Sequence, residues 1–342
     1  INSKNGSFIK ANAKAPWQAI FGNTGNMNAL LSFGIYKEDL SALLTREQLN
    51  ALEIFDDEML KGRFVVNGNV TYMNIDTIDI DIPTIANLQA NGHAKNLNDI
   101  DKLEASIDLG CVTDDIKKII GQETNDSTPK AIIHADGNIK YATNGISTDL
   151  DIKGLDGKIK AKASYDIHNN IYETGVEIKD IDITTLLSDL PLNHFTGKIS
   201  ADGKGFDIFD EQTRYNVEVS IDSIVYDSIR LNDITVNANQ SKSISEMTFS
   251  SNSDYLKFNI KADTELKRNK IANRTAIDIS QADFMMLGIT DAELGTKFKL
   301  NIEASTDMNE SHALKFNGKE MEITTLNQKF TPAEIAFDFA TT

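Results

Sequence analysis

The sequence is poor in cysteine, proline and aromatic residues, and it has no long hydrophobic run. Its 342 residues include one cysteine, Cys111, and five prolines, and aromatic residues make up 7%. A single cysteine cannot form an intramolecular disulfide. Without an apolar run of about 18 residues, no segment is expected to cross a membrane as a helix. Hydrophobic residues make up 40%, which is enough to cover a surface but low for one large compact core.

Positive charge is also scarce in this chain. Lysine and arginine number 34 against 51 for aspartate and glutamate, which gives a net charge of −17. A chain this acidic repels polyphosphate, so nucleic acid is not expected as a partner. Direct adhesion to anionic lipid head groups is disfavoured for the same reason.

Residue patterns typical of catalysis or metal binding are missing too. The five histidines are not at metal-ligand spacing, and the G-x-S-x-G, P-loop and dinucleotide-binding fingerprints are absent. Asp76, Asp79 and Asp81 resemble a calcium cluster, but an EF-hand's glycine and distal glutamate are missing, which favours the solvated face of a strand. Cys111 stands between an expected strand and an expected helix, where a thiol pKa can be lowered, although an inert thiol is favoured. We therefore expect no enzyme, no metal site and no cofactor.

Alternation of apolar and polar residues with a period of two runs through most of the chain. Val176 and Ile178, for example, alternate with charged residues, which is the pattern of a strand with one apolar face. Turn-forming pairs such as Asn144-Gly145 separate successive runs, as in antiparallel hairpins. The sequence therefore predicts a mainly β chain of about twenty strands in meander order, with short helices.

A strand, a short amphipathic helix and a second strand recur along the chain. The unit is clearest at residues 176–205, where Leu186, Leu187 and Leu190 fall at helical spacing between two alternating segments. Similar units occupy residues 33–70, 107–139 and 277–304. The acidic residues expected to open the helices, where unpaired amides need acceptors, are Asp39, Asp115, Asp182 and Asp283. We expect one elongated repeat body over residues 1–342, with approximate units 1–60, 61–121, 122–196, 197–290 and 291–342.

The apolar face of each predicted strand needs a cover. Two packed sheets or a closed barrel cover it with the protein itself, whereas a long sheet curled into a trough leaves it open to a ligand. The repeated helices favour an elongated, curled antiparallel sheet over a single barrel. The apolar positions can be interpreted as a closed core or as a ligand groove, and the sequence does not decide between the two. The groove candidates are Phe64, Val66, Val70, Ile78, Ile80, Ile82, Ile133, Ile139, Leu150, Ile152, Ile159, Ala161, Val176, Ile178, Val217, Val219, Leu256, Phe258, Ile260, Phe298, Leu300 and Ile302.

One segment resembles a known family. Residues 178–209 read I-K-D-I-D-I-T-T-L-L-S-D-L-P-L-N-H-F-T-G-K-I-S-A-D-G-K-G-F-D-I-F. This segment resembles the repeat of TamB-type translocation and assembly module proteins of Bacteroidota, and more broadly of the AsmA-like superfamily. The rest of the chain is similar to them in its repeat pattern. The family motif is degenerate and has no invariant catalytic residue, so no site residue transfers individually.

The resemblance implies a fold, a location and partners. The fold would be a β-taco, or repeating β-groove, in the periplasm of the cell envelope, and this chain would be a soluble internal fragment of a protein anchored elsewhere in the inner membrane. The ligand would be phospholipid or another acyl-chain lipid moving between the inner and outer membranes. A second partner would be an outer-membrane barrel assembly protein. Two alternatives remain: a scaffold or chaperone that pairs strands at a sheet edge, and a closed-core surface repeat protein that binds no lipid.

Overall fold

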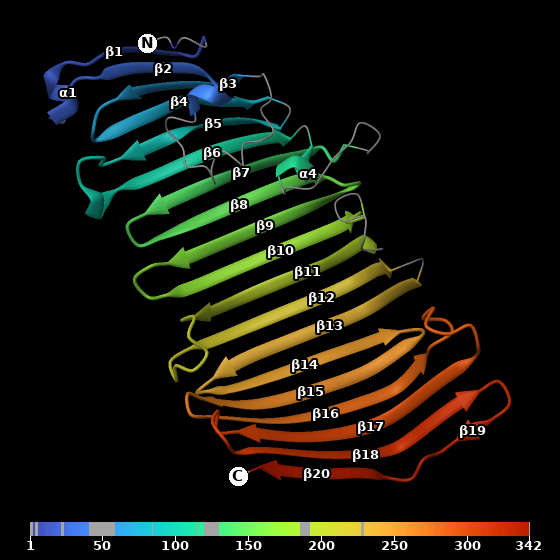
Figure 1. The fold of residues 1–342 in the computed structure, drawn as a ribbon. Coiled ribbons are helices and arrows are strands. Elements are labelled where there is room, and N and C mark those ends of the chain that lie inside the picture. Colours follow the sequence, from blue (N-terminus) through green and yellow to red (C-terminus); the bar gives the residue numbers. More distant parts are fainter. Residues whose placement is uncertain are drawn as a thin grey trace. The chain divides into compact units, whose positions relative to one another are not determined.

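The computed structural model describes residues 3, 6–21, 24–40, 59–83, 85–113, 115–119, 130–184, 192–226 and 229–341. The described residues form twenty β-strands and a few short helices (Figure 1). None of these helices is long and apolar enough to cross a bilayer. Two compact units divide the chain: unit 1 comprises Ile1–Ile167 with Thr185–Ser188, and unit 2 comprises His168–Thr184 with Asp189–Thr342.

Unit 1 is an antiparallel meander in which each strand pairs with the next along the chain. Its strands are β1 Phe8–Lys14, β2 Met27–Tyr36, β3 Met59–Gly68, β4 Tyr72–Ile82, β5 Ala86–Lys95, β6 Glu104–Thr113, β7 Ile133–Ala142, β8 Gly145–Gly154 and β9 Gly157–Asp166. Its helices are α1 Trp17–Phe21, α2 Lys37–Leu40, the 3₁₀ turn η1 Ile100–Lys102 and α4 Ile116–Ile119.

Unit 2 has the same meander order, and no helix occurs among its described residues. Consecutive strands pair from β10 to β18, and β18 pairs with both β19 and β20. The strands are β10 Ile171–Ile181, β11 Leu192–Lys204, β12 Arg214–Tyr226, β13 Ile229–Ser241, β14 Ile244–Ser253, β15 Leu256–Lys267, β16 Lys270–Asp283, β17 Leu294–Thr306, β18 His312–Thr325, β19 Lys329–Phe330 and β20 Ile335–Thr341.

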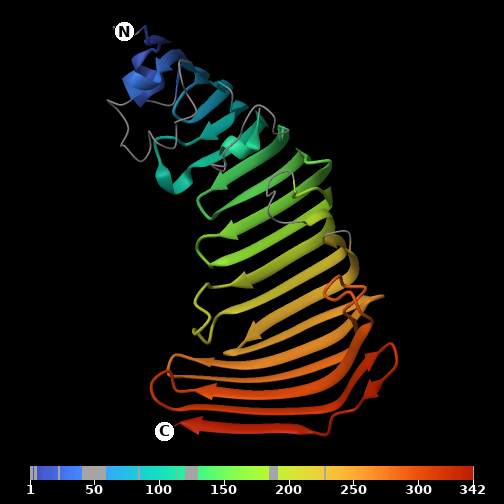
Figure 2. The ribbon, with the colours of Figure 1, turned by 45° about the vertical axis from the view of Figure 1, so that its right-hand side comes forward.

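In neither unit is the sheet closed or strongly curled. The predicted mainly β fold and its antiparallel meander are confirmed, whereas a strong curl is not found. Local bending does occur: Figure 2 shows the orange and red strands of unit 2 bending near one end. The register shifts between Ile279 and Ala282 and between Lys297 and Lys299 lie in these strands. Such bulges bend a strand because one residue has no direct partner across the ladder.

In each unit the sheet has one apolar and one polar face. Successive residues of a strand point to opposite sides, and residues paired directly across strands point to the same side. In unit 1 one row of partners runs Leu31, Phe64, Ile78, Ala90, Leu109, Gly137, Leu150 and Ala161. In unit 2 the matching row runs Val176, Ile199, Val219, Val236, Phe249, Ile260, Ile277 and Leu300. We call the sides that carry these rows the apolar face of unit 1 and the apolar face of unit 2.

The polar faces carry cross-strand ion pairs. Lys162 Nζ lies 3.1 Å from an Asp149 carboxylate oxygen, and Lys198 Nζ lies 3.2 Å from Glu177 Oε1. Both pairs are well exposed, so each contributes little to stability, of the order of ~0.2–1 kcal/mol. Their effect is to favour one strand register, since a slip by one residue would move the charges onto the apolar face.

Three of the four acidic residues expected to open helices do accept amide hydrogen bonds. Asp115 Oδ1 accepts from Lys117 N at 3.2 Å, Asp182 Oδ1 from Thr184 N at 2.9 Å and Asp283 Oδ1 from Met286 N at 3.0 Å. Asp39 lies inside α2, and its carboxylate accepts from hydroxyl groups near the N-terminus instead.

The helices themselves follow the prediction only in part. α4 follows Asp115, where a helix was expected, and α2 contains Asp39, where another was expected, although residues 41–58 after it lie outside the described residues. The helix expected after Asp182 lies almost wholly outside them as well. After Asp283 the prediction is wrong: the chain makes one turn, closed by Leu287 N donating to Asp283 O at 3.0 Å, and Gly288 follows at φ +66°. The five approximate repeat units stay a prediction.

Candidate functional site

The predicted groove residues gather on the two apolar faces. Every one of them except Val70 lies in a strand, and the register places those of unit 1 on its apolar face and those of unit 2 on the other apolar face. Val70 lies instead in the turn between β3 and β4, where its amide donates to Ala19 O at 3.3 Å. The turn begins after Gly68, so the alternation that runs through Phe64 and Val66 ends two residues before Val70.

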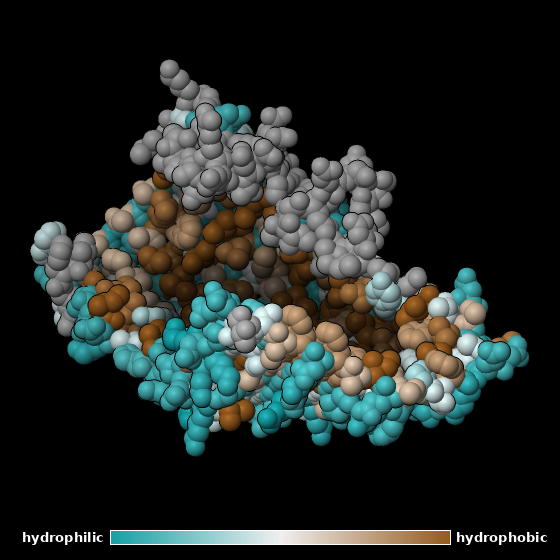
Figure 3. Space-filling model, turned by 60° about the horizontal axis from the view of Figure 1, so that its bottom comes forward, coloured by the Kyte–Doolittle hydropathy of each residue, from teal (hydrophilic) through white to brown (hydrophobic). Residues whose placement is uncertain are grey.

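The apolar faces are only partly covered. None of the predicted groove residues is buried, and Ile139 is 36% exposed. The buried hydrophobic side chains among the described residues are mostly small, and seven of the ten are alanines, such as Ala90 and Ala262. Figure 3 shows hydrophobic side chains lining a hollow and hydrophilic ones on the surface beside it. Because exposed apolar area costs about 25 cal/mol per Å², such a face gains free energy from any apolar cover.

A small buried cluster lies at one end of the apolar face of unit 1. Ile85 and Ala86 are buried there, and Leu60, Ile82 and Cys111 pack against them. Cys111 pairs in register with Leu88 and Ala135, so its thiol belongs to the apolar face. Burial raises the pKa of Cys111, which is the opposite direction to the lowering that the start of a helix would cause.

We expect the Cys111 thiol to react several-fold more slowly with a maleimide at pH 8 than the same chain unfolded in urea. The raised pKa leaves less thiolate, which is the reacting species, and the reaction should speed up as the pH rises. Stopped-flow or mass-spectrometric labelling of this single cysteine measures the rate directly. Equal rates for the folded and unfolded chain would contradict the placement of the thiol.

The recesses of the polar faces do not assemble a reactive site. A cavity of about 400 Å³ in unit 2 is lined by charged groups that include Asp263, Arg274, Glu303 and Lys315. Arg274 Nε lies 3.8 Å from Glu303 Oε1, so its charge is partly balanced within the protein. No group of three potential metal ligands occurs among the residues that the structure describes.

The aspartates that resemble a calcium cluster each have a separate partner. Asp76 accepts from the Asn67 amide, and Asp79 Oδ1 accepts from Asn87 Nδ2 at 3.3 Å. Asp81 lies 4.0 Å from Lys61 Nζ across the β3–β4 pair. These contacts agree with the interpretation of a solvated strand face.

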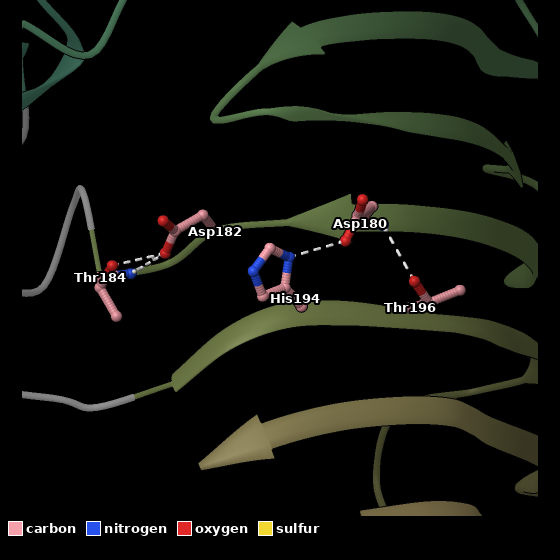
Figure 4. Close-up of polar contacts among 5 residues, drawn as sticks. All are labelled: Asp180, Asp182, Thr184, His194 and Thr196. Atoms are coloured by element: carbon pink, nitrogen blue, oxygen red, sulfur yellow. Dashed lines mark hydrogen bonds and ion pairs between the residues drawn. The ribbon is translucent and has the colours of Figure 1, made fainter. Parts of the chain in front are cut away.

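A polar cluster marks the β10–β11 bulge in the segment that resembles the family repeat (Figure 4). His194 Nδ1 lies 2.9 Å from Asp180 Oδ1, and the Asp180 amide donates to Thr196 Oγ1 at 3.0 Å. Both Asp180 and His194 have positive φ, near +53° and +50°. The Thr184 hydroxyl donates to Asp182, so neither threonine is placed as a nucleophile activated by the imidazole. The cluster satisfies the backbone of an irregular strand pair.

The site therefore consists of two partly exposed apolar sheet faces with no reactive constellation among the described residues. The chain was compared with protein-family models, with curated proteins and with solved structures. No family model matches it, and neither the curated proteins nor the solved structures give a significant match.

Proposed function

We propose that the apolar faces of the two units bind the acyl chains of lipids. The observation that supports this is the register: the predicted groove side chains of each unit share one face, and on that face they remain partly exposed. An acyl chain laid on such a face would gain about 0.8 kcal/mol for each buried CH₂ group, without directional contacts.

The arrangement suits movement of a lipid better than tight retention. Rows of similar side chains, such as Val176, Ile199 and Val219, repeat from strand to strand across unit 2. A chain displaced by one strand would meet nearly the same surface, so neighbouring positions would have similar free energies. We propose that the protein is a periplasmic segment of a TamB-like or AsmA-like envelope protein, that it transfers phospholipid between the inner and outer membranes, and that it acts in outer-membrane protein assembly.

Native mass spectrometry of the purified protein tests the lipid proposal. We expect adducts with the mass of phospholipid, at roughly stoichiometric amounts, and a delipidated sample should regain them after incubation with a labelled phospholipid. Binding should also slow maleimide labelling of Cys111, because the thiol lies on the apolar face of unit 1. A delipidated sample that takes up no phospholipid under these conditions would overturn the proposal.

A further inference from the structure

One register row on the apolar face of unit 2 is polar. The row crosses seven adjacent strands, from β10 to β16, next to the turns that join β11 to β12, β13 to β14 and β15 to β16. We call it the polar row, and its members in strand order are Tyr172, Gly203, Tyr215, Gln240, Ser245, Thr264 and Asn273. Six of the seven side chains carry hydrogen-bonding groups, and none carries a full charge.

The corresponding row of unit 1, next to its own turns, differs in kind. Its members are Gly68, Met73, Ala94, Ala105, Tyr141, Ile146 and Tyr165. Apart from two tyrosines this row is apolar, so the polar row is a feature of unit 2 and not a general consequence of lying near the turns.

Hydrogen bonds link members of the polar row. The Tyr215 hydroxyl lies 2.9 Å from Ser245 Oγ, and Asn273 Nδ2 donates to Thr264 Oγ1 at 2.8 Å. Gly203 leaves space for the Tyr172 ring, because a Cβ at this glycine would lie 2.5 Å from the Tyr172 hydroxyl. The row is therefore an ordered band of hydroxyl and amide groups beside the apolar rows.

Gln240, in the middle of the row, holds an unpaired hydrogen-bond acceptor. The residue is 2% exposed, and its Nε2 donates to Ile208 O at 2.7 Å, which fixes the orientation of the amide. Its Oε1 is buried and has no hydrogen-bond partner among the residues that the structure describes. Buried side-chain oxygens almost always have a partner, so a donor that reaches this atom would find a free acceptor.

The loop over residues 205–213 forms the border of the row at this point. Ile208 contacts Gln240 from this loop, and the Phe206 ring stacks on Tyr172 with centroids 5.1 Å apart. Asp207 forms an ion pair with Arg268 in the turn between β15 and β16. The loop is thereby attached to β10, to β13 and to the β15–β16 turn, and it lies beside the polar groups.

We propose that the polar row receives the head group of the lipid whose acyl chains lie on the apolar rows of unit 2. This inference rests on the proposed lipid binding. It adds a substrate class: lipids of zero net charge whose head group carries N–H or O–H donors. The absence of charged side chains in the row gives no compensation for a net charge, and the unpaired Gln240 Oε1 is a free acceptor for such a donor. Phosphatidylethanolamine has such donors, whereas phosphatidylcholine, with the same net charge, has none.

A competition experiment tests the head-group preference. Equal concentrations of short-chain phosphatidylethanolamine and phosphatidylcholine with identical acyl chains are added to the delipidated protein, and native mass spectrometry gives the ratio of the two complexes. We expect about a three- to tenfold preference for phosphatidylethanolamine, which corresponds to one or two hydrogen bonds. Gln240→Met should remove the preference and Tyr215→Phe should reduce it.

The control variant is Asn239→Met, the same amide-to-thioether change on the neighbouring exposed residue of the polar face, and it should keep the preference. Equal binding of both lipids by the unmodified protein would overturn the head-group inference and leave the proposed lipid binding in place. Binding of neither lipid would overturn both. A preference that persists in both Gln240→Met and Tyr215→Phe would also overturn the assignment of the polar row.

Discussion

Replacing Phe258 by aspartate is expected to lower the affinity of the apolar face of unit 2 for labelled phospholipid about tenfold or more, because the change removes a large apolar contact and adds a charge to that face. Phe258 lies on β15, pairs in register with Ser251 and Ile279, and packs edge-on against Phe249 with ring centroids 4.7 Å apart. An acyl chain over this point would have to desolvate the carboxylate. Equivalent substitutions at Ile80 or Ile159 on the apolar face of unit 1 should act in the same direction.

The matched control for this prediction is Asn259→Asp. It adds the same charge one residue further along β15, on the exposed polar face, and should leave uptake unchanged. Far-UV circular dichroism of both variants checks that the sheet is retained. If Phe258→Asp takes up as much phospholipid as the unmodified protein while it stays folded, the apolar face of unit 2 is not the binding surface.

Replacing Gly68 by alanine is expected to destabilise unit 1 by about 3 kcal/mol, since a strained backbone conformation and a steric clash both act against the new methyl group. Gly68 ends β3 with φ +129°, and a Cβ there would lie 2.2 Å from Tyr72 O and 3.0 Å from Met73 Cα. Both neighbours are backbone atoms of the paired strand, so they cannot move aside as a flexible side chain would. Urea unfolding followed by circular dichroism and by Trp17 fluorescence measures the change.

Gly175→Ala supplies the control for the stability measurement. Gly175 lies inside β10 in an ordinary strand conformation, and a Cβ there would meet no atom within 4 Å. Its replacement should be neutral or stabilising by up to about 1 kcal/mol, because alanine restricts the unfolded chain. A loss of stability at Gly68 no larger than that at Gly175 would show that the β3–β4 turn relaxes to accept a side chain.

Strands and their apolar faces were predictable because the alternation is a local signal. Val176 and Ile178 face the same side in any register, so the sequence alone assigns them correctly. The bulges were not predictable in this way. Ile75 and Ile78 are three residues apart, which implies opposite faces in a regular strand, yet a register shift between them puts both on the apolar face of unit 1. Only the pairing with β3 and β5 reveals this.

The short helices and the polar row show two further limits. The sequence at Asp283 has two signals of a helix: a carboxylate that accepts from the first amides, and apolar residues at helical spacing after it. Gly288 in the left-handed region nevertheless ends the segment after one turn. The polar row depends on which residues of seven strands stand side by side. Tyr172 and Asn273 are 101 residues apart in the chain, and alternation within one strand contains no information on that alignment.

The meander has a consequence for how such a chain can change its length. Loss of one strand would reverse the direction of every strand after it in the unit and move their connections to the opposite edge of the sheet. Loss of two consecutive strands leaves all directions unchanged. Excision of β13 and β14 would bring Val219 of β12 opposite Ile260 of β15. These two residues already belong to one row of partners, which runs Val219, Val236, Phe249 and Ile260. Insertions and deletions compatible with this sheet therefore come in whole hairpins, and related chains should differ by even numbers of strands.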